Sequence, residues 1–112
     1  MASDTVELVQ GTLEFLILKT LSTGEPKHGF HVLRWIHETT EGALTIEEGS
    51  LYPALHRMEK RKWIQSEWGV SEKGRRAKYY RLTRKGRQQL AQASDTWESY
   101  ADAVFKVLRS AN

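Results

Sequence analysis

The chain has 112 residues, 39% of them hydrophobic and 28% charged, which suits one compact domain with a modest core and excludes a disordered tail. The absence of cysteine excludes disulfide scaffolds, thiolate metal sites and cysteine nucleophiles. The sequence has no apolar run of about 18 residues and no secretory signal pattern, so we expect a cytoplasmic protein without membrane contact.

The formal net charge is only +3, but the positive charge is concentrated in the middle third of the chain. Residues 73–87 hold eight Lys or Arg side chains and no Asp or Glu. Such a block repels itself unless an anion faces it, which favours nucleic acid over a solvated basic face. An acidic membrane surface is a weaker alternative, because no amphipathic helix with bulky apolar anchors carries this charge.

Helical periodicity predicts two helices in the first third of the chain. The first runs over residues 12–21, after a weaker turn through Val6, Leu8 and Val9. Residues 23–26 then supply a stop, since Gly accepts positive φ and Pro cannot continue a helix. The second helix covers residues 28–39. Residues 43–46 are either a brief strand or an extended connection.

A third helix is predicted to begin near Gly49 or Ser50, with Ser50 as its N-cap and Pro53 in its first turn. Its buried stripe contains Leu51, Leu55, Met58 and Lys62, with Lys62 able to extend its amine into solvent.

After the third helix the apolar residues change to a period of two, which is typical of a β-strand. Residues 63–68 and 77–82 are aromatic and β-branched, and they predict a hairpin with a basic tip over residues 69–76. Tyr79 and Tyr80 should point to opposite faces, one toward the core and one toward the surface.

Thr83 can cap a last helix over residues 84–110, roughly 40 Å long at 1.5 Å per residue. A helix of this length cannot bury its apolar stripe within so small a domain, so part of the stripe requires a partner. The stripe consists of Leu90, Ala93, Trp97, Ala101, Val104, Leu108 and Ala111.

These elements predict an α+β, mainly helical fold: a winged helix-turn-helix over residues 1–83 and a dimerisation helix over residues 84–112, together forming one structural unit. In such a fold one helix enters the major groove of DNA and the hairpin tip reaches the flanking backbone. The DNA-binding candidates on the third helix are Ser50, Tyr52, Pro53, His56, Arg57 and Lys60, and those on the hairpin are Lys73, Arg75, Arg76 and Lys78.

Three of these side chains suggest distinct contacts. Arg57 has the donors for a bidentate bond to guanine, His56 can donate to a base acceptor, and Tyr52 can bond a phosphate or pack on a thymine methyl. The alternative is an ordinary solvated helix face.

Catalytic and metal-binding patterns are absent from the sequence. The pair His28 and His31 has no carboxylate or cysteine to complete a ligand set, so we expect no metal and no cofactor. Ser50 lacks a nucleophile elbow, and no Gly-rich loop would cradle a phosphate. We therefore expect no enzyme.

Four segments occurring in order closely resemble the PadR family of bacterial winged-helix transcriptional regulators over about residues 8–110. They are residues 28–30 (HGF), 48–55 (EGSLYPAL), 67–69 (EWG) and 74–83 (GRRAKYYRLT). The single terminal helix is similar to the shorter subfamily. Phe30 departs from the Tyr often found there, which removes one hydroxyl contact to phosphate. His28 and the Gly29 backbone remain candidates for meeting the DNA backbone.

The resemblance implies a homodimer that binds a palindromic promoter site, acts as a repressor and dimerises through the last helix with help from the first. The dimerisation residues are expected to be Leu90, Ala93, Trp97, Ala101, Val104 and Leu108. Trp97 is interpreted first as a dimer-core anchor and alternatively as a stacking surface for a small aromatic effector. The rival function is a winged-helix protein-interaction module without specific DNA binding.

Overall fold

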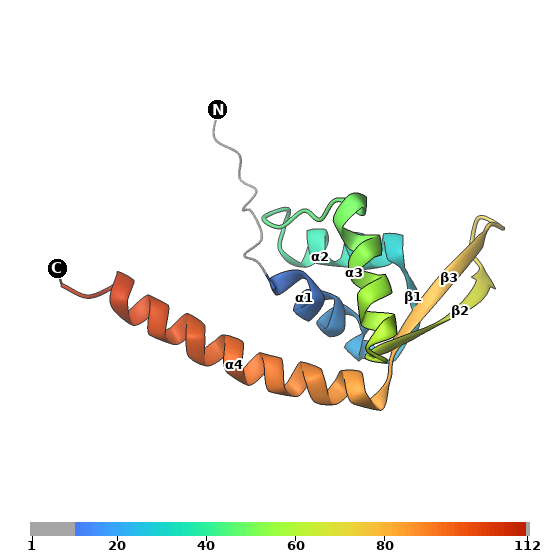
Figure 1. Cartoon of the computed structure of the whole chain (residues 1–112). Helices are drawn as coiled ribbons and strands as arrows, with labels where there is room; N and C mark the ends of the chain where they lie inside the picture. Colours follow the sequence, from blue (N-terminus) through green and yellow to red (C-terminus); the bar gives the residue numbers. More distant parts are fainter. Residues whose placement is uncertain (1–10, 112) are drawn as a thin grey trace.

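A computed structural model describes residues 11–111 of the chain (Figure 1). In chain order its elements are α1 (Thr12–Thr20), the 3₁₀ turn η1 (Leu21–Thr23), β1 (Lys27–His28), α2 (Gly29–Thr39), α3 (Glu48–Lys60), β2 (Ile64–Val70), β3 (Arg76–Leu82) and α4 (Arg84–Leu108). Helices α1 to α3 and the sheet form a winged helix-turn-helix, which confirms the α+β prediction. The turn predicted through Val6, Leu8 and Val9 lies outside the described residues.

The core lies where α1, α2, α3 and the base of the hairpin meet. The predicted stripe of α3 is confirmed for Leu51, Leu55 and Met58, which are almost completely buried. Helix α1 contributes Ile17 and Leu18 to the same cluster. The hairpin closes the cluster, and its buried side chains are Ile64, Tyr80 and Leu82.

The sheet has the order β1-β3-β2, and all its pairs are antiparallel. Strand β1 was not predicted, because two residues show no period and become a strand only by pairing with Tyr79 and Tyr80 of β3. Tyr80 is buried and Tyr79 is partly exposed, as the alternation predicts. Residues 43–46 form no strand and are the connection before α3.

The start of α3 differs from the prediction. Its N-cap is Glu47, and the Ser50 N–H already donates to the Glu47 carbonyl at 3.0 Å, so Ser50 lies inside the helix. Pro53 is therefore within the helix instead of in its first turn, where it gives no N–H to the Gly49 carbonyl. Lys62 lies beyond the last turn, is exposed and has a φ of 64°, so it is not part of the buried stripe.

A tight junction joins the hairpin to α4. Thr83 caps α4 as predicted: its hydroxyl accepts from the Gly86 N–H at 3.0 Å, and its own N–H donates to the Trp63 carbonyl at 3.0 Å. A Cβ added at Gly86 would lie 2.0 Å from the Trp63 carbonyl oxygen. The backbone of α4 therefore approaches the hairpin as closely as only glycine permits.

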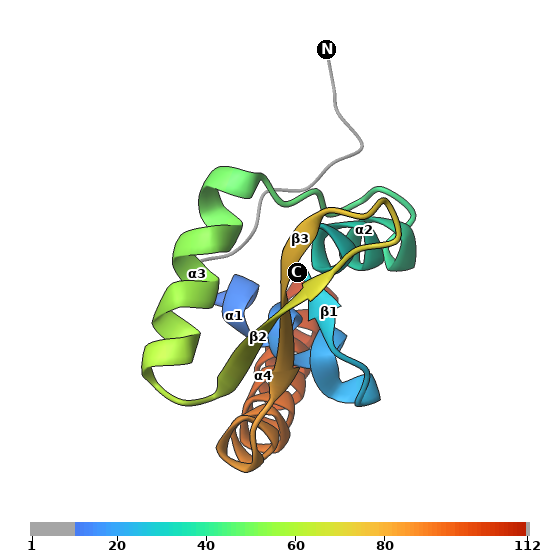
Figure 2. The ribbon, with the colours of Figure 1, turned by 90° about the vertical axis from the view of Figure 1, so that its right-hand side faces the viewer.

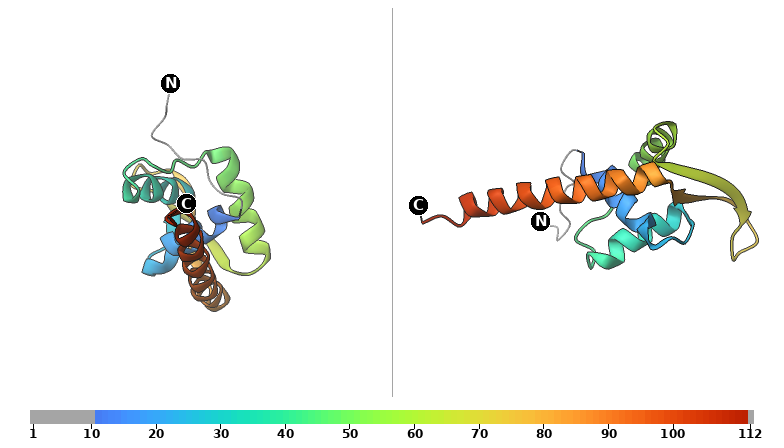
Figure 3. Two further views of the ribbon diagram at one scale, coloured as in Figure 1. Left: turned by 90° about the vertical axis from the view of Figure 1, so that its left-hand side faces the viewer. Right: turned by 90° about the horizontal axis from the view of Figure 1, so that it is seen from below.

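Helix α4 packs against α1 along its first half and then extends away from the rest of the domain (Figures 1 and 3). Leu90 packs on the core, whereas large apolar side chains of the second half are exposed. They are Trp97, Tyr100, Val104, Phe105, Val107 and Leu108, with exposed fractions of 37–73%. No helix in the described part of the chain combines the length and hydrophobicity needed to cross a membrane.

Candidate nucleic-acid interface

Helix α3 lies along one side of the domain (Figure 2), and most of its polar side chains are exposed. Because Leu51, Ala54, Leu55 and Met58 fill the buried side, the six candidates on this helix occupy the remaining arc. All six are exposed: Ser50, Tyr52, Pro53, His56, Arg57 and Lys60.

The start of α2 meets Tyr52 of α3. A Cβ at Gly29 would lie 2.9 Å from the Tyr52 ring, so the glycine makes room for the tyrosine. Burial, followed by the nearby Glu48 carboxylate, raises the pKa of Tyr52, whose hydroxyl therefore stays protonated at neutral pH. The sequence segments 28–30 and 48–55 thus meet at this contact.

His28 is the N-cap of α2, and its Nδ1 accepts the His31 N–H at 3.3 Å. Its ring stacks on His31 with centroids 3.8 Å apart and meets the edge of Tyr79 at 5.5 Å. Burial lowers the pKa of His28, and the charges of His31 and Arg34 lower it further. His28 is therefore a neutral hydrogen-bond acceptor at pH 7, next to the first N–H groups of α2.

The hairpin tip is a compact turn over residues 71–75. The Gly74 N–H donates to the Ser71 carbonyl at 2.8 Å, and Gly74 has a φ of 75°, in the left-handed region that glycine adopts without strain. Lys73 and Arg75 project from this turn and Arg76 begins β3 directly after it, and none of the three forms an ion pair with a described residue. Their positive charge is available to an external anion.

These parts line a concavity of about 880 Å³ between the start of α2 and the hairpin, to which α3 contributes Tyr52. It brings together six of the predicted DNA-binding residues: His28, Tyr52, Lys73, Arg75, Arg76 and Lys78. Ser50, Pro53, His56, Arg57 and Lys60 do not line the concavity and lie along α3 beside it. The concavity and the exposed face of α3 together form what we call the basic face.

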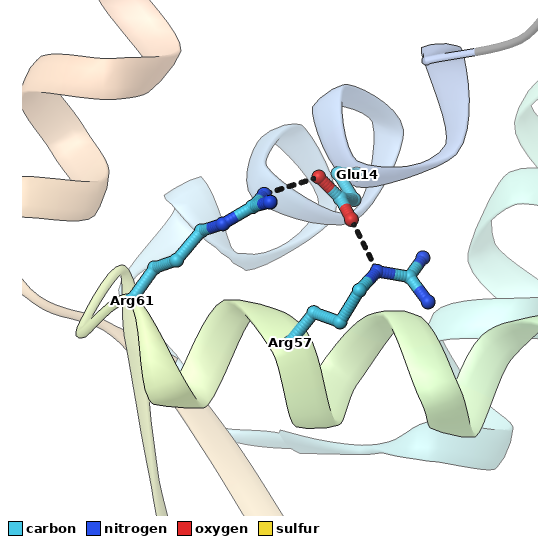
Figure 4. Close-up of polar contacts among 3 residues, drawn as sticks. All are labelled: Glu14, Arg57 and Arg61. Atoms are coloured by element: carbon cyan, nitrogen blue, oxygen red, sulfur yellow. Dashed lines mark hydrogen bonds and ion pairs between the residues drawn. The ribbon is translucent and has the colours of Figure 1, made fainter.

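Arg57 does not project freely into solvent. Its Nε lies 3.0 Å from one Glu14 oxygen, and Arg61 reaches the other oxygen at 3.1 Å (Figure 4). Both arginine side chains are about half exposed, so each pair contributes at most about 1 kcal/mol to stability. Arg57 can therefore exchange Glu14 for another acceptor at low cost.

Glu59 ties α3 to the hairpin. Its carboxylate accepts the Ser66 hydroxyl at 2.5 Å and lies 3.8 Å from the Lys78 amine. The angle between α3 and the hairpin is therefore fixed by side-chain contacts in addition to the shared core.

Sequence reasoning missed Glu14, Glu59, Arg34 and Trp68. Arg34 and Trp68 line the concavity. Trp68 could have been found from the sequence, because a large aromatic residue is unusual in the outer half of a hairpin, away from the core. Contacts of Glu14 and Glu59 depend on how the helices pack, which no local pattern encodes. Across residues 11–111, no three His, Cys, Asp or Glu side chains converge as they would around a metal ion.

A winged helix whose third helix exposes its polar face beside a basic concavity at the hairpin defines a DNA-binding module. Residues 17–92 match the family model described as the transcriptional regulator PadR-like family. Because this match spans more than half of the chain, the protein belongs to the PadR-like family of DNA-binding transcriptional regulators.

Solved structures of other transcriptional regulators are similar over nearly the whole chain. A PadR-like transcriptional regulator from Bacillus cereus is 32% identical, with 90% of this chain and 95% of that chain covered and a TM-score of 0.76. A transcriptional regulator from Clostridium thermocellum is 30% identical, with coverages of 87% and 93% and a TM-score of 0.77. A PadR family regulator from Clostridium difficile is 29% identical, with coverages of 88% and 99% and a TM-score of 0.76.

Proposed function

We propose that the protein is a repressor without catalytic activity that binds a palindromic promoter site as a homodimer. The basic face is the observation that carries this proposal. Lys73, Arg75 and Arg76 have no acidic partner in residues 11–111, and they border the same concavity as His28 and Tyr52. In this proposal α3 enters the major groove, while the turn over residues 71–75 lies on the flanking backbone.

Dimerisation is supported by the exposed apolar stripe of α4. Trp97, Val104 and Leu108 lie within roughly 40° of one another on a helical wheel with about 100° per residue. In a twofold dimer the apolar stripe of each α4 would pack against that of the other chain, so both stripes would be buried in one interface. The dimer would then set the spacing of its two α3 helices to about 34 Å, one turn of DNA.

Release by a small aromatic effector is a further part of the proposal. The rings of Trp97 and Tyr100 lie 5.9 Å apart on the unpartnered half of α4, so a dimer would gather several aromatic rings near its axis. A flat ligand releases DNA only if it binds the DNA-competent and DNA-incompetent arrangements with different affinities. Tryptophan fluorescence titrated with planar aromatic compounds tests this, with a Trp97→Ala dimer as the control.

The decisive experiment is selection of bound duplexes from a random library, followed by affinity measurements on the selected site at several salt concentrations. With three to five phosphate contacts per protomer, log affinity should fall against log salt with a slope of roughly −5 to −9. Arg76→Ala should weaken binding to all sequences. Arg57→Ala should also relax preference at particular bases, by about 1–3 kcal/mol.

Lys106→Ala is the matched control, because it removes one exposed cation from the last turn of α4. That end of α4 lies away from α3 and the hairpin (Figure 1). This variant should leave affinity and salt slope unchanged. Failure to enrich any site, together with binding that is flat in salt, would overturn the proposal and favour the protein-interaction module.

A further inference from the structure

Trp68 is an exposed indole on the hairpin, and 55% of its surface is accessible. It pairs across the hairpin with Lys78, and Val70 pairs with Arg76. Side chains alternate along a strand, so Trp68 shares a face with Ile64 and Ser66. Ile64 is in the core and Ser66 bonds to Glu59 of α3, so this is the face that α3 covers at its base.

Two cationic side chains lie over the Trp68 ring. The guanidinium carbon of Arg76 lies 4.4 Å from the ring centroid, and the Lys78 amine lies 5.9 Å from it. Lys78 is in turn 3.8 Å from Glu59, so the chain of contacts runs from α3 to the ring. Such cation–π contacts orient an aromatic ring while leaving the rest of its surface free.

The surroundings of Trp68 determine which partner fits it. The ring lines the basic concavity with Arg75 and Arg76. An apolar protein surface placed there would have to strip water from these cations without neutralising them. A DNA backbone offers apolar deoxyribose to the ring and phosphates to the cations on either side of it.

We propose that Trp68 packs on deoxyribose of the DNA backbone, between the groove entered by α3 and the groove approached by the turn over residues 71–75. This inference rests on the proposed function and adds an apolar contact among the cations of the hairpin. Covering roughly 60 Å² of indole at about 25 cal/mol per Å² corresponds to about a tenfold gain in affinity for each protomer.

The test compares Trp68→Ala, Trp68→Phe and Arg76→Gln on the same duplexes, with affinity measured by fluorescence anisotropy from low to moderate salt. Trp68→Ala should weaken binding about tenfold for each protomer on both selected and unrelated duplexes, with the salt slope unchanged. Trp68→Phe should recover part of the loss. Arg76→Gln should instead make the slope shallower, by roughly 0.9 for each phosphate contact removed.

Gln65→Ala is the control, because Gln65 is exposed on the opposite face of the same strand. It should change neither affinity nor slope. Thermal unfolding of each variant tests whether the fold is intact. If Trp68→Ala is unfolded, the comparison uses Trp68→Phe instead. A Trp68→Phe variant that binds DNA as tightly as the native protein, or not at all, would overturn the inference.

Two results would overturn the inference and leave the proposed function intact. One is unchanged affinity in Trp68→Ala while Arg76→Gln binds more weakly. The other is a slope in Trp68→Ala that becomes as shallow as in Arg76→Gln, because the ring would then only position its cations. If no variant or native protein binds a selected duplex, the proposed function itself fails.

Discussion

The winged-helix part of the chain and the second half of α4 differ in how completely they cover their own apolar surface. In the winged helix, core side chains such as Ile17, Leu51 and Ile64 are at most 1% exposed. On α4, Trp97 and Val104 are each 37% exposed and Leu108 is 71% exposed. The first region has a core of its own and exposes separate apolar side chains such as Trp68 and Val70, whereas the second exposes a row of them along one helix.

The same comparison separates recognition from assembly. The basic face is built and braced inside one chain, through the Gly29–Tyr52 contact and the Glu59 contacts. The distance between two such faces would depend on α4. The junction at Gly86 is tightly packed, so a rotation of α4 in a dimer would carry the whole winged helix with it.

The largest expected effect comes from charging the exposed stripe of α4. Trp97→Glu combined with Val104→Glu should prevent dimerisation, because two carboxylates cannot be buried in an apolar interface. Loss of the second binding module should lower affinity for a two-half-site duplex by roughly 10²–10⁴. Sedimentation at micromolar concentration and DNA titration measure the two effects.

Gln92→Glu combined with Ser99→Glu is the matched control, since both residues are exposed and lie about 140–160° from Trp97 around the helix. This variant gains the same charge and should remain dimeric. A native protein that stays monomeric at micromolar concentration would contradict dimerisation through the stripe of α4.

The junction provides the next largest effect, measured by urea unfolding. Gly86→Ala should destabilise the fold by about 1–3 kcal/mol or more, because its Cβ meets the Trp63 carbonyl oxygen at 2.0 Å. Gly49→Ala should act in the opposite direction, by up to about 1 kcal/mol, since Gly49 is helical and has open space around its Cβ position. Equal effects of the two substitutions would show that the junction tolerates a side chain.

Glu14→Gln should slightly lower stability and slightly raise DNA affinity. Loss of the ion pairs to Arg57 and Arg61 should lower stability by at most about 1 kcal/mol, because the arginines are half exposed. It should also raise DNA affinity a fewfold, since a negative charge beside α3 is removed and Arg57 is released. Glu98→Gln on α4 is the control, and equal affinity gains in both variants would indicate net charge alone.

The sequence predicted the elements that depend on local period and capping: the helices, the hairpin, the Thr83 cap and the buried stripe of α3 apart from Lys62. It failed where the outcome depends on residues far apart. Strand β1 exists only through β3, and Glu14 meets Arg57 across 43 positions. Ser50 was a reasonable cap by residue type, but the N-cap is Glu47, three residues earlier, and the helix begins at Glu48, where a carboxylate also suits the positive end of the helix dipole.

Most of the predicted basic face could be read from the sequence because its cations are close together along the hairpin. The pairing of Arg57 with Glu14 could not be read, since a helical wheel gives the direction of a side chain and not its partner. The close approach at Gly86 was equally hidden, because a glycine required by packing looks the same in sequence as one tolerated on a surface.

The smallest expected effect is a pH dependence within the basic face. Burial and the charges of His31 and Arg34 hold the pKa of His28 below its ordinary value of 6.5, while Glu72 acts weakly in the opposite direction. The folded state therefore binds this proton less readily than the unfolded state. The contribution of His28 to the free energy of unfolding should be complete above about pH 6.5 and should decrease as the pH falls below this value.

Protonation of His28 would also occupy Nδ1, the atom that accepts the His31 N–H and caps α2. The loss should not exceed about 1 kcal/mol, the typical contribution of one N-cap. His28→Asn keeps an acceptor at the cap but does not titrate, so its stability should vary less between pH 5 and pH 8 than that of the native protein. Urea unfolding across this range measures the difference, and parallel curves for the two proteins would assign the pH dependence to another group.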